Sequence, residues 1–219
     1  MSLTLFAHPF AAYCQKALIA LYENDTRFAY RLLDQSAPAT FEEFAHLWPI
    51  RKFPLLVDDG RPIAEATIIV EHLGVRHPGP VRLIPEDAAT ALEARFLDRF
   101  FDNYVQTPVT KIVTDRLRAP EERDAKGVAE ARQQLDTAYR WLEDHMAGHV
   151  WAAGETFTLG DCAAAPSLFY ADWAHPIGNE CAAVRAYRSR LNKRPSFARC
   201  MEEARPYRHL FPLGAPDRD

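Results

Sequence analysis

The sequence predicts an α/β unit over residues 1–77 and an all-helical (all-α) unit over residues 88–219, joined by a linker at residues 78–87. Three observations predict this division. Short runs of strand type alternate with helical patterning in the first unit. Three prolines and a glycine follow within PGPVRLIPED, which suits a linker. The remaining residues are helically periodic, with essentially no strand signal.

The first unit has the predicted order β-α-β-α-β-β-α. Its strand runs are at residues 3–6, 28–33, 55–57 and 63–64, and its helical patterning is at 12–23, 40–47 and 66–76. Asp59-Gly60 predicts a tight hairpin, because a type I′ turn needs φ > 0 at both central residues. The β-α units require crossovers, so we expect parallel pairing in a mixed four-stranded sheet with helices on its faces.

The second unit is expected to be a set of helices. Periodic segments run from about residue 88 to 118, 121 to 147, 159 to 174, 179 to 192 and 195 to 204. Pro108 predicts a kink in the first segment, because proline removes a backbone donor and clashes with the preceding turn. Residues 206–219 are predicted to form an irregular tail.

The composition excludes several classes of protein. The chain has 219 residues, 48% of them hydrophobic, which is ample for packed cores. Its 26 basic and 30 acidic residues are mixed and give a net charge of −4, so we expect neither a nucleic-acid nor a membrane partner. No signal peptide or apolar membrane span is evident, which makes a cytoplasmic location the expectation. The cysteines are scattered without zinc spacing, so we expect no metal.

Residues 6–21, FAHPFAAYCQKALIAL, predict a strand end, a loop and the open N-terminus of a helix. Unpaired N–H groups and a partial positive charge make such a terminus favourable for an anion or a thiolate. Many enzymes place a hydroxyl or a thiol there. This chain has Ala11 and Ala12.

Two further motifs complete a pattern. Residues 52–73, KFPLLVDDGRPIAEATIIVEHL, place an X-Pro pair before a strand and a hairpin, and then an acidic residue at a helix start. Residues 157–173, FTLGDCAAAPSLFYADW, place Thr158 and Asp161 in capping-box spacing at the start of a helix rich in small residues. With the opening motif and the two-unit organisation, the chain resembles the glutathione transferase superfamily over nearly its whole length.

The resemblance implies a thioredoxin-like N-terminal domain that binds glutathione as cosubstrate. Pro54 is then expected to be cis, leaving the backbone of Phe53 to pair with the cysteinyl part of glutathione. Lys52 matches a position whose polar side chain often contacts the tripeptide. Glu65 and Ala66 match the positions that receive its γ-glutamyl end.

The chain departs from the family pattern at Ala11, where the family usually has a catalytic serine or cysteine. The remaining Cys14 lies one turn into the helix, where a thiol tends to be buried and unreactive. The helix dipole alone lowers the pKa of a bound thiol, so thiol activation is still expected. We favour Tyr13 as the catalytic donor, because a phenol can donate to a thiolate. A non-catalytic role for Tyr13 at the domain seam stays open.

A second departure is Ala66, where the family usually has serine. Losing one hydrogen bond to a charged group costs about 1.5–3 kcal/mol. The hydroxyl of Thr67 can replace the hydrogen bond lost at Ala66 only if the helix start shifts. Glu65 can alternatively be a buried cap or a surface acid.

The second-substrate pocket is expected to involve five residues: His8, Phe10, Asn103, Tyr104 and Thr107. All of these except Phe10 are also candidate substitutes for the missing hydroxyl. His8 can instead cap its loop, and Tyr104 can belong to a hydrophobic wall. Phe96, Phe100 and Tyr104 form one helical stripe, expected to be core, pocket wall or the contact of a homodimer.

These residues favour an enzyme that conjugates the glutathione thiolate to a small apolar electrophile. The alternative is a noncatalytic binding or interaction protein that kept the fold, which the two alanines keep open. A glutathione-dependent isomerase or dehalogenase would use the same thiolate on another substrate.

Overall fold

The computed structural model describes residues 2–34 and 36–219, and its N-terminal part contains a mixed four-stranded sheet. Its strands are β1 (Leu3–Ala7), β2 (Ala29–Leu32), β3 (Leu55–Asp58) and β4 (Arg61–Ala64), in the order β2-β1-β3-β4. β1 pairs with β2 in parallel and with β3 antiparallel, and β3 pairs with β4 antiparallel. The expected mixed sheet is confirmed.

The second β-α connection does not give a parallel pair. β2 ends with Leu32 beside Ala7, and β3 begins with Leu55 beside Phe6, so both lie at the same end of β1. Residues 48–54, which lack helix and strand, return the chain to that end after helix α2 (Pro38–Leu47). A crossover fixes parallel pairing only when it carries the chain to the opposite end of the sheet.

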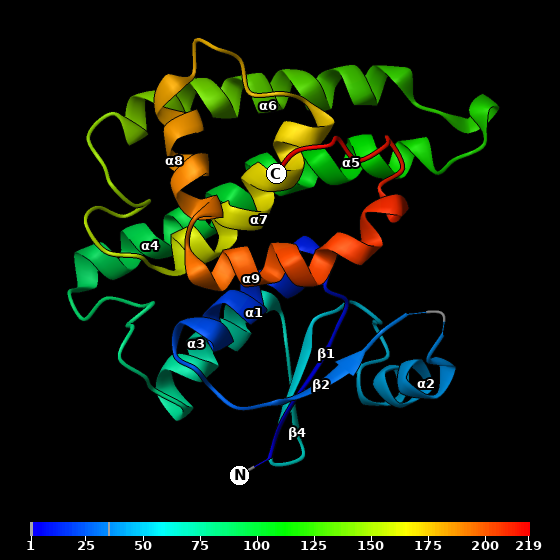
Figure 1. Cartoon of the computed structure of the whole chain (residues 1–219), viewed down its shortest axis with the longest axis vertical. Helices are drawn as coiled ribbons and strands as arrows, with labels where there is room; N and C mark the ends of the chain where they lie inside the picture. Colours follow the sequence, from blue (N-terminus) through cyan, green and yellow to red (C-terminus); the bar gives the residue numbers. More distant parts are fainter. Residues whose placement is uncertain (1, 35) are drawn as a thin grey trace.

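Helices cover both faces of the sheet (Figure 1). α1 (Ala12–Glu23) and α3 (Ala66–Arg76) pack against each other between the sheet and the C-terminal helices. α2 covers the other face through a small core of Phe6, Leu33, Phe44 and Leu55. The β3–β4 hairpin turns at Asp59 and Gly60, whose φ angles of 46° and 83° confirm the predicted turn.

The C-terminal part is helical, as predicted. Its elements are α4 (Ala88–Phe100), the π-helical segment η1 (Phe101–Gln106), α5 (Thr107–Arg116), the short η2 (Pro120–Glu122), α6 (Ala125–Met146), α7 (Leu159–Ala174), α8 (Ala182–Asn192), α9 (Pro195–Ala204) and the 3₁₀ segment η3 (Arg205–Leu210). The irregularity expected near Pro108 takes the form of η1, because the wider π-helical turns lie where the ring opposes the preceding turn. Residues 206–210 of the predicted irregular tail belong instead to η3, and the chain is irregular only after it. Within the described part of the chain, no helix is long and apolar enough to cross a membrane.

α7 is the central helix, and all of its residues are buried. It packs on α1, α4 and η1. The predicted capping box is present: Asp161 Oδ2 accepts the Thr158 backbone N–H at 2.8 Å. Asp161 Oδ1 also accepts a hydrogen bond from the Tyr187 hydroxyl at 2.6 Å, so this buried carboxyl links the start of α7 to the neighbouring helix α8. Its role is folding.

Candidate functional site

The N-terminus of α1 presents backbone groups rather than polar side chains. Ala11 is the N-cap, with extended φ and ψ of −97° and 124°, and no side chain of the described residues caps the helix. The first turn contains no acidic residue. The free N–H groups and the positive end of the dipole are therefore not neutralised locally, which favours an anion at this point.

Cys14 does not take the place of the missing nucleophile. Its thiol is fully buried and accepts the His8 backbone N–H at 3.4 Å. Burial raises the pKa of Cys14 to about 12, so the sulfur stays protonated at neutral pH. Cys14 is a structural residue.

Tyr13 projects from the first turn of α1 towards the C-terminal helices. Its side chain is 37% exposed. Partial burial, and then the negative charge of Asp102, raise the pKa of Tyr13 to about 12, while Arg99 and a hydrogen bond with Thr107 act in the opposite direction. The phenol therefore stays protonated at neutral pH and can donate a hydrogen bond.

The segment before β3 has the predicted backbone form. The Phe53-Pro54 peptide bond is cis. Phe53 lies outside the strand ladder, which begins at Leu55, and its side chain is 37% exposed. The neighbouring Lys52 is also exposed. The backbone of Phe53 is thus placed where an extended ligand can pair with it.

The N-terminus of α3 begins at an unusual backbone conformation. Glu65 has φ 72° and ψ 120°, which costs a non-glycine residue on the order of 1–3 kcal/mol. Its side chain is exposed and makes no cap bond in the described structure. Glu65 is therefore not a buried cap. Ala66 begins the helix and is buried, so the helix start is not shifted.

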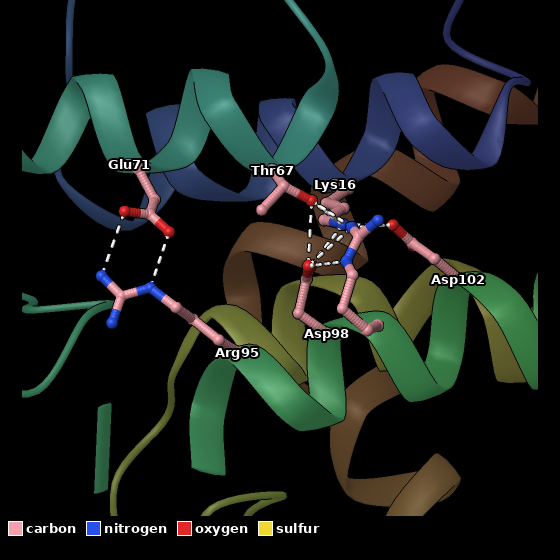
Figure 2. Close-up of polar contacts among 7 residues, drawn as sticks. Lys16, Thr67, Glu71, Arg95, Asp98 and Asp102 are labelled. Carbon is pink, nitrogen blue, oxygen red and sulfur yellow. Dashed lines mark hydrogen bonds and ion pairs between the residues drawn. The ribbon is translucent and has the colours of Figure 1, made fainter. Parts of the chain in front are cut away.

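A buried ionic network lies directly behind this second helix start (Figure 2). Lys16 of α1 is 1% exposed and pairs with Asp98 and Asp102; its Nζ is 2.8 Å from Asp102 Oδ2. Lys16 Nζ also donates to Thr67 Oγ1 at 2.9 Å, and that hydroxyl donates to Asp98 Oδ2 at 2.9 Å. Thr67 is thus held inside the network and does not replace the serine absent at position 66.

Arg99 joins this network from its solvent side. Its Nε and Nη2 donate to Asp98 Oδ2 at 2.9 and 2.7 Å, and its side chain is half exposed. Burial raises the pKa of Asp102, and the charge of Lys16 opposes that shift. Two cations and two carboxyl groups therefore balance one another beneath Tyr13, with a guanidinium at the surface.

A cavity of about 240 Å³ adjoins the start of α1. It is lined by Phe10 and Ala12 and by residues of the end of η1, of α5 and its C-cap, of α7 and of the C-terminal segment: Gln106, Val109, Thr110, Val113, Thr114, Leu117, Tyr170, Leu210, Phe211 and Pro212. Most of these side chains are apolar. The cavity is suited to a small apolar molecule next to the helix terminus.

The five residues that were expected to form the second-substrate pocket do not lie together in the structure. Phe10 lines the cavity and packs edge-on to Tyr170. Thr107 lies beside Tyr13 instead, and its hydroxyl donates to the Asp102 carbonyl at 2.9 Å. His8 accepts the Phe10 backbone N–H at Nδ1 and packs against Tyr207, so it fixes the loop.

The other two residues lie away from this cavity. Asn103 is exposed and does not line it. Tyr104 packs on Phe100 and lines a separate cavity of about 540 Å³, together with Trp141 and residues of α6. Sequence reasoning missed Val109, Val113 and Leu117, although their spacing after Pro108 marks one helical stripe.

Comparisons with known proteins agree with this architecture. The family profile for the glutathione S-transferase N-terminal domain matches residues 5–81, and that for the C-terminal domain matches residues 125–190. Glutathione S-transferase U10 of Arabidopsis thaliana is 27% identical over 136 residues, which is 62% of this chain and 56% of that protein. Glutathione S-transferase-like protein LUC7 of Fusarium sp is 32% identical over 142 residues, 64% and 62% of the two chains. The matched segments thus span less than two thirds of these relatives.

Solved structures give the same result. A glutathione S-transferase of Methylobacillus flagellatus with glutathione bound has a TM-score of 0.81 at 21% identity, covering 91% of this chain and 98% of that one. A glutathione S-transferase of Methylobacterium radiotolerans, in complex with glutathione sulfonate, has a TM-score of 0.77 at 25% identity, covering 91% and 94%. The first likeness concerns the fold alone. With both domain profiles matched over most of its length, the chain belongs to the glutathione transferase superfamily.

Proposed function

We propose that this protein binds glutathione and conjugates its thiolate to a small apolar electrophile. One observation carries the proposal: the uncapped α1 N-terminus, whose free N–H groups favour an anion, directly adjoins the apolar cavity. Ala12 belongs to both, because it is the first residue of the helix and also lines the cavity. A thiolate held at this point lies beside a molecule bound next to Phe10.

In the proposed reaction, the α1 N–H groups and the Tyr13 hydroxyl stabilise the thiolate sulfur. The sulfur attacks an electrophilic carbon and forms a C–S bond, while the leaving group departs with its bonding electron pair. The thiol proton goes to solvent when glutathione ionises. Tyr13 donates throughout, because the pKa of its phenol is raised to about 12.

The γ-glutamyl end of glutathione is proposed to bind at the α3 N-terminus. Its carboxylate faces the free N–H groups of that helix and the exposed guanidinium of Arg99. Its ammonium group faces Glu65, which is exposed beside the same helix start. Arg99 thereby supplies the charge-assisted donor that a serine at position 66 would otherwise supply.

The competing proposal is a noncatalytic protein that retains the fold. The absence of polar side chains at Ala11 and Ala66 favours it, because each removes a donor that the family usually has. The two proposals differ in turnover and in the ligand that each requires.

Calorimetric titration with glutathione, followed by a rate measurement with an aromatic electrophile from mildly acidic to alkaline pH, tests both. We expect saturable binding and slow conjugation that rises steeply with pH, because the thiolate fraction is limiting. Binding without turnover at any pH would leave the noncatalytic proposal. If the titration shows no binding and the assay shows no turnover, the glutathione assignment is overturned.

We also propose a homodimer that covers the aromatic surface of α4 and α6. Phe96, Tyr104 and Trp141 are 44%, 57% and 38% exposed, and they surround Phe100. An exposed aromatic cluster of this kind is typical of an interaction surface. Light scattering after size exclusion should give twice the monomer mass, and Trp141→Glu should give the monomer. A parent monomer at micromolar concentration would contradict the dimer.

A cytoplasmic location remains part of the proposal. Cys14, Cys162, Cys181 and Cys200 are all free thiols. Free cysteines are typical of a reducing compartment. Fractionation of cells that express the protein with its native termini tests this location.

A further inference from the structure

Three potential metal ligands meet at the end of α3 that is remote from the proposed glutathione site. His72 Nε2 and His77 Nε2 each lie 2.8 Å from the same atom, Asp58 Oδ2. The three potential ligand atoms lie within 4.8 Å of one another. The side chains are 17%, 16% and 10% exposed for His72, His77 and Asp58, so the group is sheltered but reachable from solvent.

The backbone explains how two histidines five residues apart converge. His72 lies within α3, and a residue five positions further along a continuous helix would point to another side. The helix ends at Arg76, and His77, the C-cap, leaves the helical conformation with φ −133° and ψ 55°. Its ring centroid thereby comes within 6.1 Å of that of His72. Asp58, the last residue of β3, faces both rings.

We propose that Asp58, His72 and His77 form a binding site for a zinc ion. Two imidazole nitrogens and one carboxylate oxygen match the donor types that zinc prefers, with water in the fourth position. Zinc–ligand bonds of about 2.0–2.2 Å in a tetrahedron separate ligand atoms by about 3.3 Å. Each histidine Nε2 must therefore move about half an ångström away from Asp58 Oδ2, which side-chain torsions can provide.

The chemistry of the site needs no reaction beyond ligation. A neutral imidazole whose proton lies on Nδ1 offers its Nε2 lone pair to the metal, and the Asp58 carboxylate is anionic at neutral pH. Zinc would then replace the two hydrogen bonds with three metal–ligand bonds. Because the ligands come from β3 and from the end of α3, the ion would fasten the helix to the sheet.

Other residues offer little competition for zinc. Within residues 2–34 and 36–219, this is the only group of three histidine, cysteine or acidic side chains with such convergence. All four cysteines are buried, so their thiols do not compete from the surface. His72 and His77 also lie about 10 Å and 18 Å along α3 from Glu65, taking about 1.5 Å per residue. Zinc binding is therefore independent of the proposed glutathione chemistry.

Competition with a chromophoric zinc chelator, using tag-free full-length protein, tests the site. We expect one zinc ion per chain and a rise of several degrees in Tm when zinc is in large excess over its Kd. His77→Gln should weaken zinc binding by about 100-fold or more, because even changes to residues behind a metal ligand cost 10–100-fold. X-ray absorption should find imidazole nitrogens at about 2.0–2.1 Å from the ion.

His175→Gln is the matched control. His175 Nε2 also lies on a carboxylate, 2.6 Å from Asp136 Oδ1, but without a second histidine. This variant should bind zinc as the parent does. His72→Gln removes a second proposed ligand. The metal-free Tm and the glutathione binding of each variant show whether it is folded. Equal zinc affinity in the parent, His77→Gln and His72→Gln, or no saturable binding up to millimolar zinc, would overturn the proposal.

Discussion

The N-termini of α1 and α3, where we propose that the two ends of glutathione bind, differ in the polar groups that they present. At α1, Ala11 and Ala12 leave backbone N–H groups, helped by Tyr13, as the polar groups of the site. At α3, Ala66 is equally apolar, but Lys16, Asp98 and Arg99 lie behind it as a charged network. In the proposed complex, the thiolate at α1 thus meets a partial positive charge, whereas the zwitterionic γ-glutamyl end at α3 meets full charges of both signs.

The largest expected effect concerns the buried ionic network behind the α3 N-terminus and is measured as a loss of stability. Lys16→Met should lower the free energy of unfolding by about 3–5 kcal/mol, because it removes the buried cation and leaves Asp98 and Asp102 with the half-exposed Arg99 as their remaining partner. Equilibrium unfolding in urea measures the loss. Arg95→Met is the matched control: Figure 2 shows Arg95 of α4 paired with Glu71 of α3, and both of these side chains are partly exposed. Its loss should be about 0–1 kcal/mol.

The Lys16→Met defect should also depend on pH. Burial raises the pKa of Asp102 in the folded protein, so the folded state binds more protons than the unfolded state as this group titrates. Stability contributed by that group therefore falls as pH rises, and Lys16→Met removes the charge that opposes the shift. The defect should shrink between neutral and mildly acidic pH. A defect that is constant across this range would contradict the ionic account.

The next effect concerns recognition at α3. Arg99→Met should weaken glutathione binding by about 10- to 100-fold, because a hydrogen bond to a charged group contributes about 1.5–3 kcal/mol. Calorimetry measures the affinity, and Arg95→Met again serves as the control and should bind glutathione as the parent does. Equal affinity in the parent and Arg99→Met would remove Arg99 from the γ-glutamyl site.

At α1, adding a side-chain donor should improve catalysis. Ala11→Ser should raise the conjugation rate at neutral pH by about 5- to 30-fold, the equivalent of about 1–2 kcal/mol, because its hydroxyl adds a hydrogen bond to the thiolate. Initial rates at saturating glutathione provide the measurement. A variant that binds glutathione normally and gains no rate would show that the thiolate does not lie at the start of α1.

The smallest effect is expected from Tyr13→Phe. Losing one neutral donor should lower the rate by about 2- to 10-fold, since such a bond contributes about 0.5–1.5 kcal/mol. The pH profile should keep its shape around neutrality, because the pKa of Tyr13 is raised to about 12 and the phenol does not ionise there. A profile that changes shape near neutral pH on this substitution would contradict the donor role.

Local sequence signals predicted the two helix starts and the segment before β3 well. α1 and α3 begin at residues 12 and 66, as the pattern predicts, because a loop and a hairpin with recognisable turn residues precede them. The cis bond at Pro54 followed from the family motif and is also confirmed. These features depend on residues close together in the chain.

The other part depends on distant residues. Lys16 lies in an apolar helical run and meets Asp102, 86 positions later, only because the fold brings this part of η1 beside it. The cavity likewise takes one wall from Leu210, Phe211 and Pro212, in a tail that reads as irregular. Tyr104 was expected beside Phe10 and lies at another cavity instead, because helix rotation across the π-helical η1 cannot be read from spacing. Tertiary packing decides each of these.

The most direct measurement is the pKa of the glutathione thiol when bound, from the ultraviolet absorbance of the thiolate as a function of pH. S-methylglutathione provides the protein background, and calorimetry establishes saturation. We predict that the bound thiol titrates clearly below the value of about 8.5 typical of a free thiol, and lower still in Ala11→Ser. A bound thiol that titrates like free glutathione would contradict the claim that the α1 N-terminus activates it.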